Sequence, residues 1–368
     1  MNKENTVDFT LLFTVILLVV FGIIMVFSSS SASAYYKIGD SYYFLKRQML
    51  WAVVGFVSMV VLMNFNYENY QRLARYILAG GVLFLLTVFI PGLGITLNGA
   101  SRWIEIGGYT IQPSEFAKLA VIIYTANCIA KKKEDIRSFT KGVVPFLIVA
   151  GIVFGIIMLQ PDFSTGVSIV GVVFVMIFIA GANIGHLLGL TLPGIVAVVA
   201  LVISEEYRLK RWTSFLRPFS DPQRSGYQII QSLYALGSGG LFGLGLGRSR
   251  QKFFYIPLPQ NDFIFSIIGE ELGFIGATTV VLLFMLLIWR GVRIALHAPD
   301  LFGCMLATGI IAMIGMQVIM NIAVVTSSMP VTGITLPFIS SGGSSLLLNL
   351  SCIGILLNIS KKTSINWS

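Results

Sequence analysis

The chain contains 368 residues, of which 56% are hydrophobic and only 11% are charged, and its formal net charge is +9. A mean hydropathy of +0.86 excludes an ordinary water-soluble domain. Many apolar runs approach or exceed the ~18–20 residues that a helix needs to cross a bilayer, and the alternating segments of a membrane β-barrel are not visible. The composition therefore predicts an all-α polytopic integral membrane protein.

Ten membrane-spanning helices are predicted from the apolar runs between polar breaks. Their ranges are 9–27, 49–65, 76–90, 114–130, 143–159, 165–180, 187–203, 262–289, 302–325 and 344–360. A long loop, residues 204–261, separates the seventh span from the eighth. Because no linker or low-complexity tract is present, we expect residues 1–368 to form a single membrane domain that includes this loop.

Positive charge predicts the orientation of these helices. An even number of spans puts both termini on one side. If that side is the cytoplasm, the cytoplasmic segments carry twelve Lys and Arg and the short outer loops carry four. Cytoplasmic loops are enriched in Lys and Arg. We therefore expect a multi-pass protein of the cytoplasmic membrane with both termini in the cytoplasm.

The long loop is the basic exception on the outer side, but long loops are translocated largely regardless of charge. Its charged residues are Arg208, Lys210, Arg211, Arg217, Arg224, Arg248, Arg250 and Lys252 against Glu205, Glu206 and Asp221. A solvated basic loop is one interpretation. The apolar, Gly-rich stretch 227–246 favours an amphipathic or re-entrant segment on the outer face. Nucleic acid is not an expected partner, because these cations lie at a membrane surface.

A single carboxylate, Asp262, stands where the loop meets the eighth span. Pro257 and Pro259 discourage helix before it, so Asp262 is predicted at or just before the helix start, where the helix dipole favours its ionised form. An ionisable residue at membrane depth is a candidate functional residue. An ordinary N-cap aspartate is the alternative. Glu270, about 80° further around an ideal helix, could face the same cavity, whereas Glu271 is expected to pair with another helix.

A second polar group lies in residues 98–118. Arg102 and Trp103 precede a Gly-Gly turn, and Glu115 and Lys118 are three residues apart on one face of the next helix. Glu115 and Lys118 are either an ion pair that holds helices together or part of a substrate site. Trp103 is either an interfacial anchor or a substrate contact.

Two further polar breaks are weaker candidates. Asp162 follows a proline between two spans, where a simple turn is the preferred interpretation. The segment 330–345, which includes Ser344, offers free backbone N–H groups to an anion or a sugar, or is a tight outer turn. No phosphate-binding loop, dinucleotide fingerprint or metal-ligand cluster is visible, so nucleotide and redox cofactors are not expected.

The chain resembles the SEDS family (shape, elongation, division and sporulation) in strings that follow one another along nearly its whole length. These strings are NGASRWI, IQPSEFAKLA, QPDFSTG, GYQIIQSLYALGSGGLFGLGLGRSRQKFFYIP, NDFIF, EELGFIG and PVTGITLPFISSGGSSLL. The string GLFGLGLGRSRQKFFYIP is more similar to the FtsW and SpoVE branch than to the RodA branch. The chain departs from the frequent family pattern at Leu258 (Glu), Asn261 (Thr) and Ser341 (Tyr).

The resemblance implies a ten-helix peptidoglycan glycosyltransferase that polymerises lipid II at the outer face of the bacterial cytoplasmic membrane, in cell division or spore cortex synthesis. It implies a class B penicillin-binding protein as the transpeptidase partner, and it is compatible with a divalent cation, Mg²⁺ or Mn²⁺. The family's catalytic aspartate corresponds to Asp262, its essential tryptophan to Trp103, and its cavity Glu and Lys to Glu115 and Lys118.

The resemblance also implies the reaction. Asp262 would act as general base on the 4-hydroxyl of the acceptor lipid II, which attacks the anomeric carbon of the donor. Undecaprenyl diphosphate would leave, and inversion would give a β-1,4 bond. The departing diphosphate needs cations, and the further substrate contacts include a second acid and a hydroxyl. The candidates are Arg102, Arg208, Lys210, Arg211, Arg248, Arg250, Lys252, Glu270 and Ser344.

Two alternatives belong to other functional classes. Buried charges such as Glu115, Lys118 and Glu270 would also suit a flippase that moves lipid II across the bilayer. A non-catalytic scaffold for the penicillin-binding protein is the third hypothesis. A scaffold tolerates loss of the Asp262 carboxylate, whereas a polymerase does not.

Overall fold

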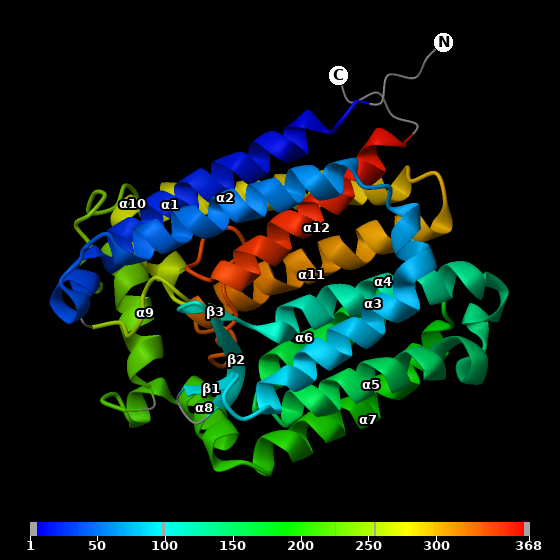
Figure 1. Ribbon diagram of the computed structural model, residues 1–368. Helices are drawn as coiled ribbons and strands as arrows, with labels where there is room; N and C mark the ends of the chain where they lie inside the picture. The colour runs from blue at the N-terminus through cyan, green and yellow to red at the C-terminus, as the bar shows by residue number, and fades with distance from the viewer. Residues whose placement is uncertain (1–5, 98–99, 225, 254, 364–368) are drawn as a thin grey trace.

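The computed structural model describes residues 6–97, 100–224, 226–253 and 255–363 (Figure 1). The long helices are α1 Phe9–Ile38, α2 Tyr43–Asn64, α3 Glu68–Leu86, α4 Pro113–Lys131, α5 Val144–Met158, α6 Phe163–Ile179, α7 Ile184–Ile203, α10 Ile264–Leu296, α11 Leu301–Val325 and α12 Gly343–Lys361. The shorter elements are α8 Glu206–Leu216, α9 Tyr227–Ser238, β1 Gly94–Leu97, β2 Ala100–Ile106 and β3 Tyr109–Ile111. Single turns of 3₁₀-helix at Thr87–Phe89, Lys133–Arg137 and Pro218–Ser220 and of π-helix at Phe139–Val143 complete the chain.

The ten long helices correspond to the ten predicted spans. Among the described residues, eight helices are long and apolar enough to cross a membrane. The other two predicted spans are α6, which has 17 residues, and α4, which carries the buried Glu115 and Lys118. Both pack against α11 inside the bundle. The all-α multi-pass fold predicted from the composition is therefore confirmed.

Helices α11 and α12 form the centre of this bundle, and most of their residues are buried. Helix α12 lies so close to α2 that a Cβ atom at Gly354 would be 2.5 Å from the Met59 carbonyl oxygen. Helix α7, by contrast, is almost entirely exposed. Because its exposed residues are apolar, they face lipid in a membrane.

Helix α1 extends eleven residues beyond its predicted end at residue 27. The added stretch begins with serines that would favour turns in water. Here the Ser30 hydroxyl donates to the Val26 carbonyl (2.6 Å) and the Ser33 hydroxyl to the Ser30 carbonyl (3.0 Å). These bonds to the preceding turn let serine remain helical, and the apolar run alone therefore underestimates the helix.

A small antiparallel sheet, with strand order β1-β2-β3, follows α3 and was not predicted. Gly107 and Gly108 both have positive φ (58° and 80°) and form the two-residue turn between β2 and β3. Such a turn matches the twist of a hairpin. Figure 1 shows the sheet at one end of the bundle with α8 and α9, which belong to the long loop. The start of α1 and the end of α12 meet at the other end, where the Asp8 N–H donates to Ser360 Oγ (3.3 Å).

Helix α9 is the predicted amphipathic segment of the long loop, and it crosses α10 at small residues. The Ser232 hydroxyl donates to the Val325 carbonyl (2.7 Å) and lies 2.8 Å from the Ser266 hydroxyl. A Cβ atom at Gly239 would lie 1.9 Å from the Gly269 carbonyl oxygen, so only glycine allows this approach. The crossing fixes the long loop against the first two turns of α10.

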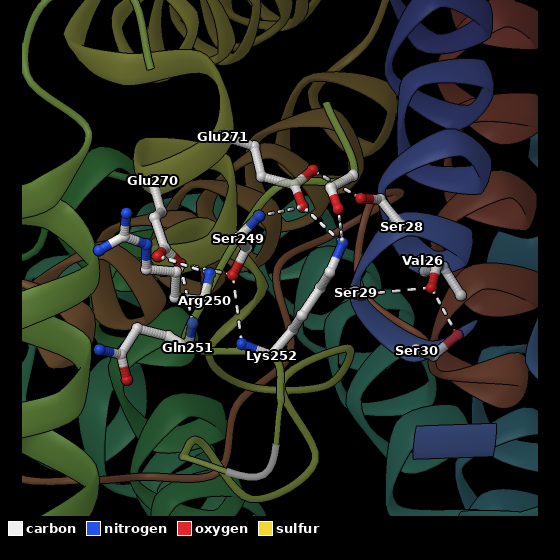
Figure 2. Close-up of polar contacts among 11 residues, drawn as sticks. Val26, Ser28, Ser29, Ser30, Ser249, Arg250, Gln251, Lys252, Glu270 and Glu271 are labelled. Atoms are coloured by element: carbon white, nitrogen blue, oxygen red, sulfur yellow. Dashed lines mark hydrogen bonds and ion pairs between the residues drawn. The ribbon is translucent and has the colours of Figure 1, made fainter. Parts of the chain in front are cut away.

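Two buried carboxylates of α10 hold the rest of the loop (Figure 2). The Glu270 carboxylate accepts hydrogen bonds from the Ser249 hydroxyl, the Arg250 N–H (2.9 Å) and the Gln251 N–H (3.4 Å). The expectation that Glu270 faces the same cavity as Asp262 is therefore wrong. Its eight-residue spacing from Asp262 assumed a continuous helix, but α10 begins only at Ile264.

Glu271 makes the other half of this cluster. Its carboxylate accepts from the Ser28 hydroxyl of α1 (2.6 Å), the Ser249 N–H (3.2 Å) and the Lys252 ammonium (3.0 Å), as Figure 2 shows. Lys252 also donates to the Gly247 carbonyl (2.7 Å). Glu271 thus contacts another helix, as expected. We call Ser28, Ser249, Lys252, Glu270 and Glu271 the loop-anchoring cluster.

We expect Lys252→Met to lower the free energy of unfolding by about 3–5 kcal/mol, because it leaves the Glu271 carboxylate buried without its cation. The measurement is chemical or thermal unfolding in detergent. The matched control is Lys210→Met, whose ion pair with Glu206 is exposed and screened by water, so its loss should change stability far less. Equal losses in the two variants would contradict the assigned role of the cluster.

Candidate functional site

A polar cavity of about 460 Å³ opens at the end of the bundle that carries the sheet. Its walls come from β2, β3, the starts of α4 and α6, helix α8, the turn before α10, helix α11 and the segment before α12. Of the candidate site residues named from the sequence, the cavity brings together eight: Arg102, Trp103, Glu115, Lys118, Asp162, Arg211, Asp262 and Ser344.

Asp262 lies in the turn that precedes α10. The N-cap of that helix is Phe263, so Asp262 is not the capping residue. Its carboxylate oxygen lies 3.6 Å from the position that a Cβ atom at Gly333 would occupy, across the cavity wall. Burial raises the pKa of Asp262 to about 6, although the guanidinium groups of Arg211 and Arg102 lower it. A carboxylate with such a pKa can accept a proton near neutral pH.

Arg102 and Asp162 form a rigid corner beside Asp262. The Arg102 side chain donates to the carbonyls of Gln160 (3.1 Å) and Pro161, and it lies 4.0 Å from the Asp162 carboxylate. Asp162 accepts from the Thr165 N–H (3.3 Å), which makes it the N-cap of α6. The turn interpretation of Asp162 is thus correct, but this turn also lines the cavity.

Helix α8 presents two arginines toward the bundle, because Arg208 and Arg211 are three residues apart. The Arg211 side chain donates to the Val331 carbonyl (3.1 Å) and lines the cavity. Arg208 is buried; it donates to the Leu201 carbonyl (2.7 Å) and lies over the ring of Phe163. Both line a small hollow at the start of α6, within reach of an anion bound there.

The inner end of the cavity is formed by a buried ion pair and an amide. Lys118 Nζ lies 2.8 Å from Glu115 Oε1, and Glu115 Oε2 has no partner among the described residues. The side-chain oxygen of Gln317, on α11, is likewise buried without a donor. These two oxygens can accept hydrogen bonds from hydroxyl or amide groups of a ligand. Beyond Lys118 lies a small apolar hollow of about 10 Å³.

The start of α12 closes the cavity from the side of α2. The Ser344 hydroxyl accepts from the Gln112 N–H (3.3 Å), which ties α12 to the corner between β3 and α4. A Cβ atom at Gly343 would lie 2.2 Å from the indole nitrogen of Trp51, so glycine is required at this position. The segment before α12 is therefore both a tight turn and part of the cavity wall.

Five other candidates lie elsewhere. Glu270 and Lys252 are in the loop-anchoring cluster, and Lys210 pairs with Glu206 on the exposed face of α8. Arg248 and Arg250 are exposed and are not among the cavity-lining residues of the described chain. The sequence of the loop alone could not show that Arg208 and Arg211 approach the cavity whereas the other loop cations do not. Sequence reasoning also missed Gln317, since an amide within an apolar run carries little signal.

An apolar groove of about 980 Å³ runs beside the cavity between α5, α6 and α7. Leu147, Phe154, Phe174, Leu190 and Val198 are among its lining residues. A smaller hollow of about 60 Å³ has lining residues in common with both spaces. It shares Arg102, Asp162, Arg211 and Thr332 with the polar cavity, and Val167 and Trp212 with the groove. An amphiphile could therefore place its apolar part in the groove and its polar part in the cavity.

The side chains that line the cavity limit the kind of metal ion that it could bind. Among the described residues, no three His, Cys, Asp or Glu side chains gather into a metal-binding group. Asp162 and Asp262 do line the same cavity. Mg²⁺ commonly takes one or two protein carboxylates and completes its shell with water and substrate phosphate oxygens. These two carboxylates fit a cation that arrives with a phosphate, not a cage built of protein ligands alone.

Comparison with known sequences identifies close relatives of the chain. It is 52% identical over 360 residues to stage V sporulation protein E of Bacillus subtilis (strain 168), which covers 98% of each chain. It is 42% identical over 362 residues to the probable peptidoglycan glycosyltransferase FtsW of Geobacter sp. (strain M18), covering 98% of this chain and 99% of the relative.

Solved structures show the same fold. The rod shape determining protein RodA of Thermus thermophilus matches with a TM-score of 0.73 and 27% identity, and a chain of a peptidoglycan synthase complex with 0.79 and 28%. Each match covers 98% of this chain and 99% of the other. The model of the family described as cell cycle proteins (FtsW, RodA and SpoVE) matches residues 9–365. The chain therefore belongs to the FtsW, RodA and SpoVE family of cell cycle proteins.

Proposed function

We propose that the protein is a peptidoglycan glycosyltransferase that polymerises lipid II at the outer face of the bacterial cytoplasmic membrane. The observation that carries this proposal is the position of Asp262, a carboxylate with a raised pKa in a polar cavity, beside an arginine-lined hollow and an apolar groove. Lipid II has the matching parts: a polyprenyl tail, a diphosphate and sugars. The name of the Geobacter relative, probable peptidoglycan glycosyltransferase FtsW, supports the same activity.

Asp262 acts as the general base in this proposal. Its carboxylate takes the proton of the acceptor's GlcNAc 4-hydroxyl as that oxygen bonds to the anomeric carbon of the donor MurNAc. The bond between this carbon and the diphosphate oxygen breaks, and undecaprenyl diphosphate leaves with the electron pair. Attack opposite the leaving group converts the α-linked donor into a β-1,4 bond.

The arginines stabilise the leaving group. Arg102, Arg208 and Arg211 surround the hollow between cavity and groove, where negative charge develops on the diphosphate. Guanidinium groups bind phosphate oxygens in a fixed geometry, and hydrogen bonds to backbone carbonyls hold all three in place. A divalent cation that accompanies the diphosphate, next to Asp162 and Asp262, would add positive charge.

Charge and geometry support one orientation of the chain in the membrane. The sheet and α8, which contribute to the cavity wall, lie at the opposite end of the bundle from the start of α1 and the end of α12 (Figure 1). The excess of Lys and Arg in the segments at the second end supports a cytoplasmic position for both termini. The cavity is then extracytoplasmic, where a class B penicillin-binding protein can crosslink the product strands.

The interior does not favour a flippase. A translocation path needs polar surface on both sides of the membrane. Below Lys118 lies the small hollow of about 10 Å³, lined by the apolar residues Val121, Ile122 and Val172 among others. The polar cavity ends there. Chemistry at one face accounts for this arrangement, and a scaffold gives no reason for Asp262 to face the cavity.

The test of the proposed function is polymerisation of labelled lipid II by the purified protein with its penicillin-binding partner. We expect long glycan strands from the wild type and a loss of about 10²–10⁴-fold in Asp262→Asn, which keeps the shape of the side chain and removes the base. Asp221→Asn, in the same loop but outside the cavity, is the control. Equal polymer from Asp262→Asn and wild type would remove Asp262 as the base.

The rate should depend on pH through Asp262. A general base works only when deprotonated, so kcat/KM should fall as pH drops through about 6 and level off above it. Arg211→Met removes a cation that lowers the pKa of Asp262, so this acid limb should move to higher pH. Initial polymerisation rates from pH 5 to 8 give both profiles. If the acid limb of Arg211→Met lies at the same pH as that of the wild type, Asp262 is not the group that titrates.

The groove should bind the polyprenyl tail. Ala197→Trp places an indole in the groove and should raise KM for lipid II with little change in folding. Val196→Trp is the matched control, because the neighbouring side chain points away from the groove and is 60% exposed. A lipid II analogue with a short prenyl chain should be affected less by Ala197→Trp. Equal KM values in both variants would exclude this groove.

A further inference from the structure

The backbone of the turn that carries Asp262 is held at three consecutive carbonyl groups. The carbonyl of Gln260 accepts from the Ser341 N–H (2.8 Å), that of Asn261 from the Ser340 hydroxyl (2.7 Å), and that of Asp262 from the Asn321 side-chain amide (2.8 Å). The donors come from α11 and from the segment before α12. We call Asn321, Ser340 and Ser341 the carbonyl clamp.

The clamp is itself fixed from several sides. Asn321 is buried, and its amide donates a second hydrogen bond to the Ile334 carbonyl (2.8 Å). The Ser340 hydroxyl also accepts from the Leu336 N–H (2.8 Å), and the Ser340 carbonyl accepts from the Gln48 side chain of α2 (3.3 Å). One amide thus joins the Asp262 turn to the opposite cavity wall, and α2 supports that wall.

Both clamped segments contain strained backbone. Leu258 has φ of 47° and Phe338 has φ of 65°, in the left-handed region that side chains other than glycine seldom adopt. Such conformations persist only where the surroundings determine them, and they concentrate at functional sites. Burial of the clamp hydrogen bonds offsets this cost and keeps the turn in one geometry.

The clamp also explains two departures from the family pattern. Asn261 and Ser341 stand where Thr and Tyr are frequent, yet Asn261 enters the clamp through its carbonyl and Ser341 through its N–H. Every residue other than proline supplies both groups, so side chains can change at these positions without loss of the clamp. Asn321 and Ser340, in contrast, act through their side chains.

We propose that Asn321 and Ser340 are positioning residues that hold the Asp262 carboxylate toward the acceptor hydroxyl. The opposite wall, with Thr332, Gly333, Thr335 and Ser341, lines the substrate cavity, so the clamp sets the base at a fixed distance from bound substrate. General-base catalysis requires hydrogen-bond reach of the proton, and small misplacements of such groups lower rates severely. This inference rests on the proposed function, and it assigns no contact with substrate to either residue.

The test compares Asn321→Leu with Asn358→Leu in the complex with the penicillin-binding partner. Asn358 is a matched buried asparagine whose side chain also bonds two backbone groups, the Tyr67 N–H (2.9 Å) and the Met63 carbonyl (2.9 Å), far from the cavity. We expect Asn321→Leu to lower kcat by on the order of 10- to 100-fold with KM nearly unchanged. Amide hydrogen exchange of residues 260–263 should become faster in Asn321→Leu and stay unchanged in Asn358→Leu.

Other outcomes overturn the proposal. One such outcome is a folded Asn321→Leu variant with the kcat and the amide hydrogen exchange of the wild type. The other is an equal loss of kcat in Asn321→Leu and Asn358→Leu, which signals general destabilisation. If Asn321→Leu does not fold, Ser340→Ala removes a second donor of the clamp and carries the same expectations. Failure of the proposed function is separate: wild-type protein would then make no polymer, and the exchange measurement would still decide whether the clamp holds the turn.

Discussion

The structure depends on how each charge at membrane depth is compensated. Burying an ion without a partner costs several kcal/mol, and the chain meets this cost with local pairs. Arg290 donates to the buried Asp8 carboxylate, Lys118 pairs with Glu115, and Lys252 pairs with Glu271. Each pair joins segments or fixes a helix face. The buried charges therefore define the path of the chain as much as the apolar surfaces do.

Asp262 is held in place differently from these paired charges. Its backbone is fixed by neutral hydrogen bonds, whereas Arg102 and Arg211 act on its carboxylate only through the field of their charges. A direct ion pair would lower the pKa and occupy the oxygens that must accept a proton. The fixed backbone gives the carboxylate a defined position. Because the carboxylate has no ion-pair partner among the described residues, its pKa stays high enough for it to act as a base. This separation of support from reactivity is typical of preorganised active sites.

Much of the fold was predictable because local sequence patterns determine its helices. Ten apolar runs indicated ten helices, and Pro257 and Pro259 correctly placed Asp262 before a helix. The sheet was missed although Gly107 and Gly108 between alternating residues are a hairpin signal. The arginine assignments were only partly predictable. Helical spacing on α8 separates Arg208 and Arg211 from Lys210, but the partners of Lys252 and Glu270 depend on contacts that no local pattern records.

The central position of α11 and α12 has a consequence for biosynthesis. A ribosome delivers helices to the membrane in chain order, so the eight preceding long helices enter the bilayer before the two that fill the middle of the bundle. Until then the surfaces of α2 and α4 that later contact α12 and α11 face lipid or one another. Assembly must therefore remain open, with the early helices loosely associated, until translation is nearly complete. Nascent chains of this architecture would be exposed to membrane proteases and insertion chaperones for most of their synthesis.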